Sequence, residues 1–225
     1  MAKGKFIVIE GTDGSGKATQ LKLLGEYFKK RGLPFKTDDY PRYDGCWGKL
    51  IGRYLMGEFG NPLEISPYYS VLPYMIDEYT GGKEIQKWNK EGSFGLSNRY
   101  FTSNVHQVAK LKGAKRRKFR DWLWDAGWNK LGIYKPDLVI VLLVSPRVTM
   151  KMVKQKEIRK YTNGRKRDKV ERDYGHQKSS YREYLYMCKT EKNWVKINCC
   201  KGGRILSPEE IHQKMLKLLV ERKIL

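Results

Sequence analysis

Three glycines and a lysine follow the first apolar run of the chain at a spacing that suits phosphate binding. Phe6–Ile9 is apolar and rich in β-branched residues, which predicts a short buried strand. Gly11, Gly14, Gly16 and Lys17 then complete most of the pattern G-x-x-x-x-G-K-[ST]. Glycines allow positive φ and close approach, so backbone N–H groups can converge on a phosphate. Lys17 opens a helical pattern whose positive dipole end favours the same anion.

The next residue departs from this pattern, which places Ser or Thr there to contact Mg²⁺. This chain has Ala18, with Thr19 beside it. The alternative interpretation is a strand–turn–helix whose glycines only turn the chain. Phosphate binding is favoured because a strand precedes the loop and a helix follows it. The predicted ATP- and phosphate-binding residues are Gly11, Gly14, Ser15, Gly16, Lys17, Ala18 and Thr19.

The amino-acid composition limits which partners and which kinds of site are expected. The chain has 225 residues, with 46 Lys and Arg against 24 Asp and Glu and a net charge of +22. Such a surface attracts polyanions from nucleotides to nucleic acid without choosing among them. The cluster Lys110–Lys118 is interpreted as a solvated basic surface. The four cysteines lack C-x-x-C spacing, so reduced thiols are expected rather than a metal site or disulfides.

No apolar run approaches the ~20 residues that a bilayer requires. The longest is Leu138–Val144, and Met1–Lys5 leads directly into the first strand. We therefore expect no secretory leader, no membrane association and a cytoplasmic location.

The elements that must position the loop alternate between strand and helix. Strands are predicted at Phe6–Ile9, Phe35–Tyr40, Phe94–Ser97, Leu138–Val144 and Trp194–Ile197. Helices are predicted at Lys17–Lys30, Gly48–Met56, Ser66–Glu91, from Asn98 toward Lys112, around Phe119–Ala126, from Ser145, at Val170–Lys189 and from Ser207. This alternation predicts an α/β fold with a parallel sheet covered by helices on both faces.

A basic, polar stretch from Glu157 to Arg172 interrupts the pattern. It surrounds Tyr161–Gly164 with lysines and arginines and has little to bury. We interpret it as a lid over the phosphate site, the alternative being an exposed charged connector.

Taken together, these stretches make the chain resemble thymidylate kinase, a nucleoside monophosphate kinase. The matching stretches keep the family's order: Phe6–Gln20, Tyr40–Tyr43, Gly48–Gly60, Tyr74–Tyr79, Asn98–Gln107, Pro136–Val148, Arg165–Asp168 and Leu206–His212. The resemblance implies a P-loop NTPase fold of three α/β/α layers around a five-stranded parallel sheet. It implies a single domain over residues 1–225 with a lid at about 157–172, Mg²⁺-dependent phosphorylation of dTMP by ATP, and usually a homodimer.

The resemblance also implies roles for single residues. Lys17 and Arg99 would contact the phosphates, with Arg159, Arg165 and Arg167 as lid contacts to the transferred group. Asp13 would accept from the sugar 3′-hydroxyl, Arg42 would clamp the acceptor phosphate, and Tyr74 would stack on the base. Glu78 and Asn104 complete the predicted acceptor site, and Glu10 and Asn98 would hold Mg²⁺, Asn98 through water. The family's clamping arginine can sit one position later, where this chain has Tyr43.

The chain departs from the family at acidic and recognition positions. Asn98 and Leu143 stand where the family has aspartates, and Glu78 stands where an arginine would donate to the base. Losing such a hydrogen bond costs on the order of 1–3 kcal/mol. Three hypotheses follow: an active thymidylate kinase, which is favoured; a monophosphate kinase in which Glu78 accepts from an amino group such as cytosine N4; and a degenerate kinase fold that binds nucleic acid or an assembly partner.

Overall fold

The computed structural model describes residues 4–148, 173–202 and 204–225. The strands are β1 (Phe6–Glu10), β2 (Phe35–Asp39), β3 (Phe94–Asn98), β4 (Leu138–Leu143), β5 (Trp194–Asn198), β6 (Cys200–Lys201) and β7 (Arg204–Ile205). The helices are α1 (Lys17–Lys30), α2 (Cys46–Met56), α3 (Pro67–Ser70), α4 (Leu72–Lys90), η1 (Phe101–Asn104), α5 (Val105–Val108), α6 (Gly113–Trp124), η2 (Asp125–Lys130), α8 (Tyr174–Thr190) and α9 (Pro208–Glu221).

The five long strands form one parallel sheet in the order β2-β3-β1-β4-β5. β1 is central, with Ile9 opposite Asn98 of β3 and Ile140 of β4. The carboxyl ends of β1 and β3 therefore meet at one edge, where ligands bind in open α/β sheets. The predicted α/β class and five-stranded parallel sheet are confirmed.

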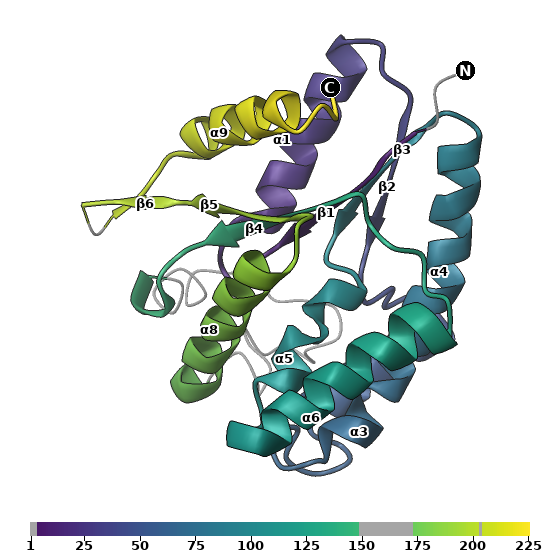
Figure 1. The fold of residues 1–225 in the computed structure, drawn as a ribbon, viewed down its shortest axis with the longest axis vertical. Coiled ribbons are helices and arrows are strands. Elements are labelled where there is room, and N and C mark those ends of the chain that lie inside the picture. Colours follow the sequence, from purple (N-terminus) through teal and green to yellow (C-terminus); the bar gives the residue numbers. More distant parts are fainter. Residues whose placement is uncertain (1–3, 149–172, 203) are drawn as a thin grey trace.

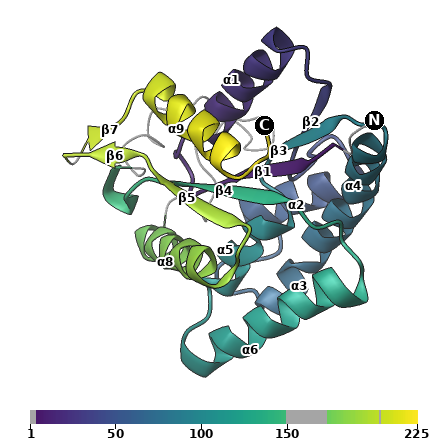
Figure 2. The ribbon, with the colours of Figure 1, turned by 45° about the horizontal axis from the view of Figure 1, so that its top comes forward.

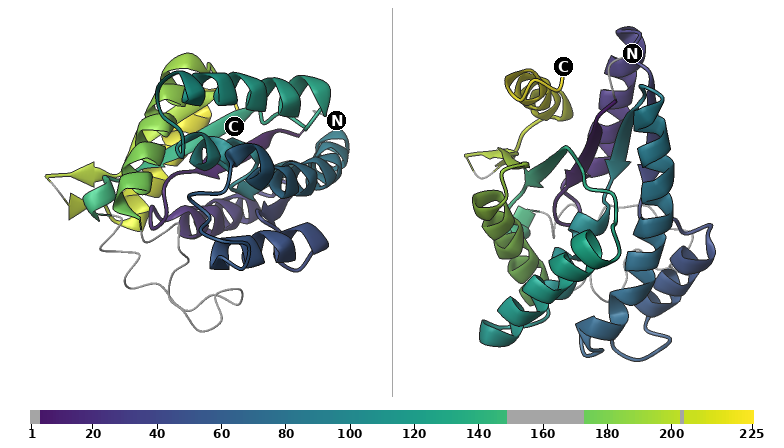
Figure 3. Two further views of the ribbon diagram at one scale, coloured as in Figure 1. Left: turned by 90° about the horizontal axis from the view of Figure 1, so that it is seen from below. Right: turned by 45° about the vertical axis from the view of Figure 1, so that its right-hand side comes forward.

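Each face of the sheet is covered by helices, because successive strand residues point to opposite faces. Ile7 and Ile9 pack with residues of α1 and α9, whereas Phe6 and Val8 pack with residues of α4, α6 and α8. Figures 1 and 2 show α1 and α9 on one side of the sheet and α8 and α5 on the other. The two views of Figure 3 show the same three layers, which were predicted from the alternation of elements.

Four details differ from the sequence-based prediction. The helix predicted over Ser66–Glu91 is divided into α3 and α4. The helix expected from Asn98 toward Lys112 is a 3₁₀ turn, η1, followed by one turn of α-helix, α5, and α6 begins anew at Gly113 with φ 55°. Its continuation η2 is a π-helix. The two-residue strands β6 and β7 were not predicted, because each is too short to show alternation.

The predicted start of the last helix is confirmed in detail. Ser207 Oγ accepts from the N–H of Glu210, and the Glu210 carboxylate accepts from the N–H of Ser207. This capping box satisfies two helix-end donors. The helix predicted after Ser145 begins at Pro146, and its part beyond residue 148 lies outside the described residues.

Candidate active site

The glycine-rich loop joins β1 to α1 at the sheet edge where β1 ends. Gly11 has φ 143° and Gly16 has φ 88°, a region that favours glycine. A Cβ on Gly11 would lie 2.6 Å from the carbonyl oxygen of Leu142, so the loop also needs glycine for close approach. Gly16 caps α1 without a side-chain hydrogen bond, and the first turn holds no acidic residue. The positive end of the helix dipole therefore faces the loop, which is the geometry of an anion site.

Lys17 lies within this loop and is buried. Its Nζ donates to the carbonyl oxygens of Gly11 at 2.9 Å and Thr12 at 3.0 Å. These two carbonyl contacts help to hold the ammonium against the loop. A phosphate oxygen, which is a charged acceptor, would bind it more strongly.

Arg99 reaches the same loop from the end of β3. Its backbone has φ 65°, a left-handed conformation that costs energy for a residue with a Cβ and is common at functional sites. Its Nη2 forms an ion pair with Asp13 Oδ1, and Gln177 Nε2 donates to the other oxygen of Asp13 at 3.2 Å. Burial lowers the pKa of Arg99, but the negative charges of Asp13 and Glu10 outweigh it and raise the pKa above its usual value.

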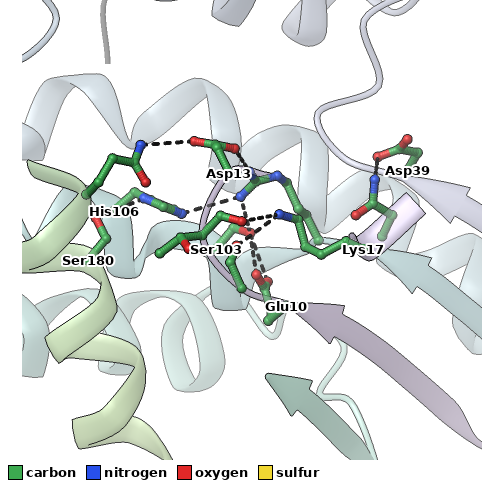
Figure 4. A network of polar contacts seen from close by, with 12 residues as sticks. Glu10, Asp13, Lys17, Asp39, Ser103, His106 and Ser180 are labelled. Atoms are coloured by element: carbon green, nitrogen blue, oxygen red, sulfur yellow. Dashed lines mark hydrogen bonds and ion pairs between the residues drawn. The ribbon is translucent and has the colours of Figure 1, made fainter. Parts of the chain in front are cut away.

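Glu10 is fully buried beneath this pair and accepts from three hydroxyl groups, as Figure 4 shows in part. Thr102 Oγ1 donates at 2.6 Å, Ser103 Oγ lies 2.9 and 2.8 Å from the two carboxylate oxygens, and Tyr184 OH donates at 2.7 Å. Neutral hydroxyls satisfy a buried carboxylate without cancelling its charge. Glu10 therefore anchors η1 and α8 to the end of β1.

A buried histidine, His176, and a half-buried one, His106, extend the network toward α8. Arg99 can only donate, so His106 Nε2, 3.4 Å from Arg99 Nη1, must accept, and its Nδ1 carries the proton toward Ser180 Oγ at 3.0 Å. Burial and the nearby Arg99 lower the pKa of His106 well below its usual value. Burial and the charge of Lys110 lower the pKa of His176 to about 4. Both rings are therefore uncharged at neutral pH.

A cavity continues from Asp13 and Arg99 along the helical layer. Five tyrosines line it together with polar and charged side chains. The lining residues are Asp13, Tyr40, Pro41, Tyr43, Tyr54, Leu55, Tyr74, Glu78, Arg99, Tyr100, Ser103, Asn104, His106, Gln107, Lys110 and His176. We call the part around Asp13, Arg99 and Ser103 the phosphate end, and the part around Tyr74, Glu78, Asn104, Gln107 and Lys110 the base end. An aromatic-walled cavity with a few polar groups is typical of a small-molecule site.

Glu78 is the acidic group of the base end. It lies one helical turn after Tyr74 on α4, and 2 % of its surface is exposed. Asn104 Nδ2 donates to Oε2 at 2.9 Å and to Oε1 at 3.2 Å. Burial raises the pKa of Glu78 well above its usual value; the Asn104 hydrogen bond opposes this shift, and the charges of Asp77 and Glu10 add to it.

Lys110 corrects the interpretation of Lys110–Lys118 as a solvated surface. Its Nζ donates to Tyr54 OH at 2.7 Å, Ser70 Oγ at 2.9 Å and the Ile65 carbonyl at 3.2 Å, all neutral groups. Burial lowers the pKa of Lys110 to about 7. The prediction failed because the exposed face of α6 begins only after Lys110, with Lys112, Lys115, Arg117 and Lys118 exposed as expected.

Asn98 lies beside the loop at the end of β3. Its Nδ2 donates to Asp39 Oδ1 at 2.8 Å, so the neighbouring strand supplies a carboxylate next to this amide. Asn98 Oδ1 is buried and has no hydrogen-bond partner among the described residues. Within the described ranges, no three His, Cys, Asp or Glu side chains come together as a metal cluster.

Arg42 is held away from the cavity lining. Its Nε donates to Asp77 Oδ1 at 2.9 Å, its Nη1 lies 3.3 Å from Glu84 Oε1, and its Nη2 donates to Thr80. Tyr43, the next residue, does line the cavity. The three predicted lid arginines, Arg159, Arg165 and Arg167, lie outside the described residues.

The structure therefore brings together the predicted residues of the loop, Glu10, Asp13, Arg99, Tyr74, Glu78 and Asn104, but not Arg42. Sequence reasoning missed Ser103, His106, Lys110, His176 and Gln177. A signal existed for His106, which falls in the segment Asn98–Gln107 already singled out. His176 and Gln177 lie on a helix with no recognisable motif, so only the fold reveals them.

Comparisons with known proteins agree with this geometry. A sequence model described as thymidylate kinase matches residues 9–214. A thymidylate kinase of Plasmodium falciparum is 29 % identical over 230 residues, covering 99 % of this chain and 92 % of that protein. A probable thymidylate kinase of Thermococcus onnurineus is 35 % identical over 160 residues, covering 68 % of this chain and 73 % of that protein. A solved thymidylate kinase structure from Candida albicans shares the fold, with a TM-score of 0.76 at 20 % identity, covering 100 % of this chain and 94 % of that one.

Proposed function

The chain belongs to the thymidylate kinase family, and we propose that it transfers the terminal phosphoryl group of ATP to dTMP, forming ADP and dTDP. The observation that carries this proposal is the position of Asp13. It belongs to the phosphate loop, pairs with Arg99 and lines the cavity, so donor and acceptor sites are continuous. Nothing in the described residues favours the alternative of a degenerate, non-catalytic fold.

Phosphoryl transfer needs in-line positioning and stabilisation of negative charge rather than covalent chemistry by the protein. The backbone of residues 11–16 and Lys17 would hold the ATP phosphates. Arg99 lies between the loop and the cavity, where it would contact phosphates of both nucleotides. Asp13 keeps Arg99 aimed at that position and would accept from the acceptor sugar.

At the acceptor side, Tyr74 lines the cavity and would stack on the base. Arg42 would need to leave Asp77 and Glu84 to reach a phosphate in the cavity. Tyr43 already lines the cavity and can donate its hydroxyl proton to an acceptor phosphate. The assignment of Arg42 as phosphate clamp stays a prediction.

We propose that ATP binds with Mg²⁺, which when bound neutralises charge on the phosphate oxygens. The residues present fit an ion held mainly by phosphates and water, as Mg²⁺ often is. The unpartnered Oδ1 of Asn98 and the adjacent carboxylate of Asp39 would face its water shell. Glu10 fits this role less well, because hydroxyl groups already contact both of its oxygens and it is fully buried.

The domain organisation and the oligomeric state are proposed by analogy with the same family. We propose one kinase domain over residues 1–225, with residues 157–172 as a lid carrying Arg159, Arg165 and Arg167 to the transferred group. A homodimer is supported by exposed apolar side chains on α3 and the start of α4: Tyr68, Tyr69, Leu72 and Ile76. A sedimentation mass of two chains would test this association.

No described helix is both long and apolar enough to cross a bilayer. The cytoplasmic location stays a prediction from the sequence, and cell fractionation would test it. The net charge of +22 leaves binding of nucleic acid as a secondary possibility that no described contact supports.

The decisive experiment measures ADP release by the purified chain with ATP, Mg²⁺ and dTMP, dUMP, dCMP or dGMP. We expect turnover with dTMP. Lys17→Met should lower kcat at least about 100-fold, because a charge-stabilising donor is lost. Lys22→Met, exposed further along α1, is the matched control and should keep wild-type turnover. Absence of ADP release with every acceptor would refute the proposal.

A further inference from the structure

Glu78 places a carboxyl group in the acceptor cavity, where it forms no ion pair with any of the described residues. Its nearest polar partner is the uncharged amide of Asn104, at 2.9 and 3.2 Å. The hydroxyl of Tyr100 donates to the Glu78 backbone carbonyl, not to its side chain. A buried carboxylate with neither cation nor multiple donors is costly, and such a group usually takes up a proton.

The charged and titratable groups that face this carboxyl group are mostly negative or distant. Asp77 of α4 and Glu10 of β1 both disfavour a negative charge on Glu78. Asp77 is itself paired with Arg42, and Arg99 with Asp13, so both arginines are already balanced. The other titratable side chains that line the same cavity are Tyr40, Tyr43, Tyr54, Tyr74, Tyr100, His106, Lys110 and His176.

Asn104 determines which hydrogen-bonding capacity Glu78 has left. Its amide nitrogen lies closer to Oε2 than to Oε1, so the carboxyl proton belongs on Oε1. Burial raises the pKa of Glu78 well above its usual value, which favours the form that carries this proton. The group then offers a donor, while its principal acceptor oxygen is occupied by the amide.

Tyr74 and Glu78 stand one turn apart on α4, and both line the cavity. Residues at this spacing lie on the same face of a helix. A base stacked on the Tyr74 ring would therefore present its hydrogen-bonding edge near Glu78. A carbonyl oxygen on that edge matches a donor, whereas an exocyclic amino group does not.

We propose that Glu78 binds the acceptor as an uncharged carboxylic acid, donating its Oε1 proton to a carbonyl oxygen of a pyrimidine ring and so selecting keto over amino pyrimidines. This inference rests on the proposed function for its ligand. Glu78 acts as a specificity-determining residue and not as a proton source for catalysis, since no bond to this proton changes during phosphoryl transfer.

The test compares wild type with Glu78→Gln, which keeps a donor of similar shape that cannot ionise. Binding of dTMP and dCMP is measured by calorimetry across a pH series from about 5.5 to about 9. The wild-type Kd for dTMP should rise about 10-fold or more at the alkaline end, as the donor is lost. The Kd of Glu78→Gln should change less with pH than that of wild type, because the titrations of the ligand and of Lys110 affect both proteins. Wild type should bind dTMP at least about 10-fold more tightly than dCMP at pH 7.

Glu91→Gln, at the exposed end of the same helix, is the control and should retain the wild-type pH profile. Infrared spectra supply a readout independent of binding: the band of a protonated carboxyl group should be present at pH 7 in wild type and shift on addition of dTMP. This infrared measurement on wild type tests whether a carboxyl group is protonated even if Glu78→Gln does not fold. A wild-type preference for dCMP, identical pH profiles for wild type and Glu78→Gln, or absence of the protonated band would overturn the inference.

These outcomes are distinct from failure of the kinase proposal. If dTMP binds with the expected pH profile but no ADP is released, the role of Glu78 in binding is supported and the proposed kinase activity is refuted. If dTMP is phosphorylated with a pH-independent KM, the kinase activity is supported and the proposed role of Glu78 is refuted.

Discussion

The two ends of the cavity stabilise buried ionisable groups in different ways. At the phosphate end, Arg99 is paired with Asp13, and Glu10 is held by three hydroxyl groups. At the base end, Glu78 and Lys110 have only uncharged hydrogen-bond partners among the described residues. Burial shifts both of these groups toward their uncharged forms.

This difference matches the ligand that each end would receive. Phosphates are charged, so fixed opposite charges that need no reorganisation stabilise them well. A pyrimidine ring is uncharged, and an unpaired ion beside it would lose hydration without gaining a counterion. The comparison teaches that the phosphate end holds a pair of opposite charges, whereas the base end holds groups that burial shifts toward their uncharged forms.

The largest expected effect comes from breaking the pair at the phosphate end. Arg99→Met leaves Asp13 buried without its cation and should lower the free energy of unfolding by about 3–5 kcal/mol in urea titrations. Arg53→Met breaks an exposed pair with Glu58 and should cost no more than about 1 kcal/mol. Equal losses in the two variants would show that burial of the pair does not matter.

A smaller effect is expected at Lys110. Its folded pKa of about 7 lies below the unfolded value, so the unfolded chain binds more protons between the two values. Wild type should therefore gain roughly 2 kcal/mol of stability relative to Lys110→Met as pH rises from about 7 to about 9. Lys115→Met, exposed on α6, should follow wild type. If the free energy of unfolding of Lys110→Met changed with pH as that of wild type does, Lys110 would not lose its charge in this range and the prediction would be wrong.

The smallest effect concerns His176, which joins the two ends. Its folded pKa of about 4 lies below the unfolded value of about 6.5, so stability is lost as pH falls between them. Between about pH 6.5 and pH 5, His176→Gln should therefore lose roughly 1 kcal/mol less stability than wild type loses. Thermal unfolding at several pH values measures it. Unchanged acid sensitivity would show that His176 does not account for the loss.

Much of the fold could be predicted because its signals are local. The apolar run of β1 and the glycines at 11, 14 and 16 fall within eleven positions, and the capping box at Ser207 spans four. Propensity and spacing act within such windows. The same reasoning predicted the helix that carries Tyr74 and Glu78.

The contacts that give the site its electrostatics could not be predicted in this way. Asp13 and Arg99 are 86 positions apart, Asp13 and Gln177 are 164 apart, and Glu10 and Tyr184 are 174 apart. Pairing of β1 with β3 brings Arg99 to Asp13, and packing of α8 against the sheet brings Gln177 and Tyr184 to the same site. Lys110 was misassigned for a related reason, since charge alone does not report which face of a segment is buried.

The strand order also has a consequence for synthesis on the ribosome. The phosphate loop follows β1, but β1 pairs only with β3 and β4, which are made much later. The loop is therefore among the first parts translated, yet its supporting strand gains its first neighbour only after residue 98 and its second only after residue 143 has emerged. Shorter nascent chains leave one or both hydrogen-bonding edges of β1 unpaired, and completion of β4 closes the last of them.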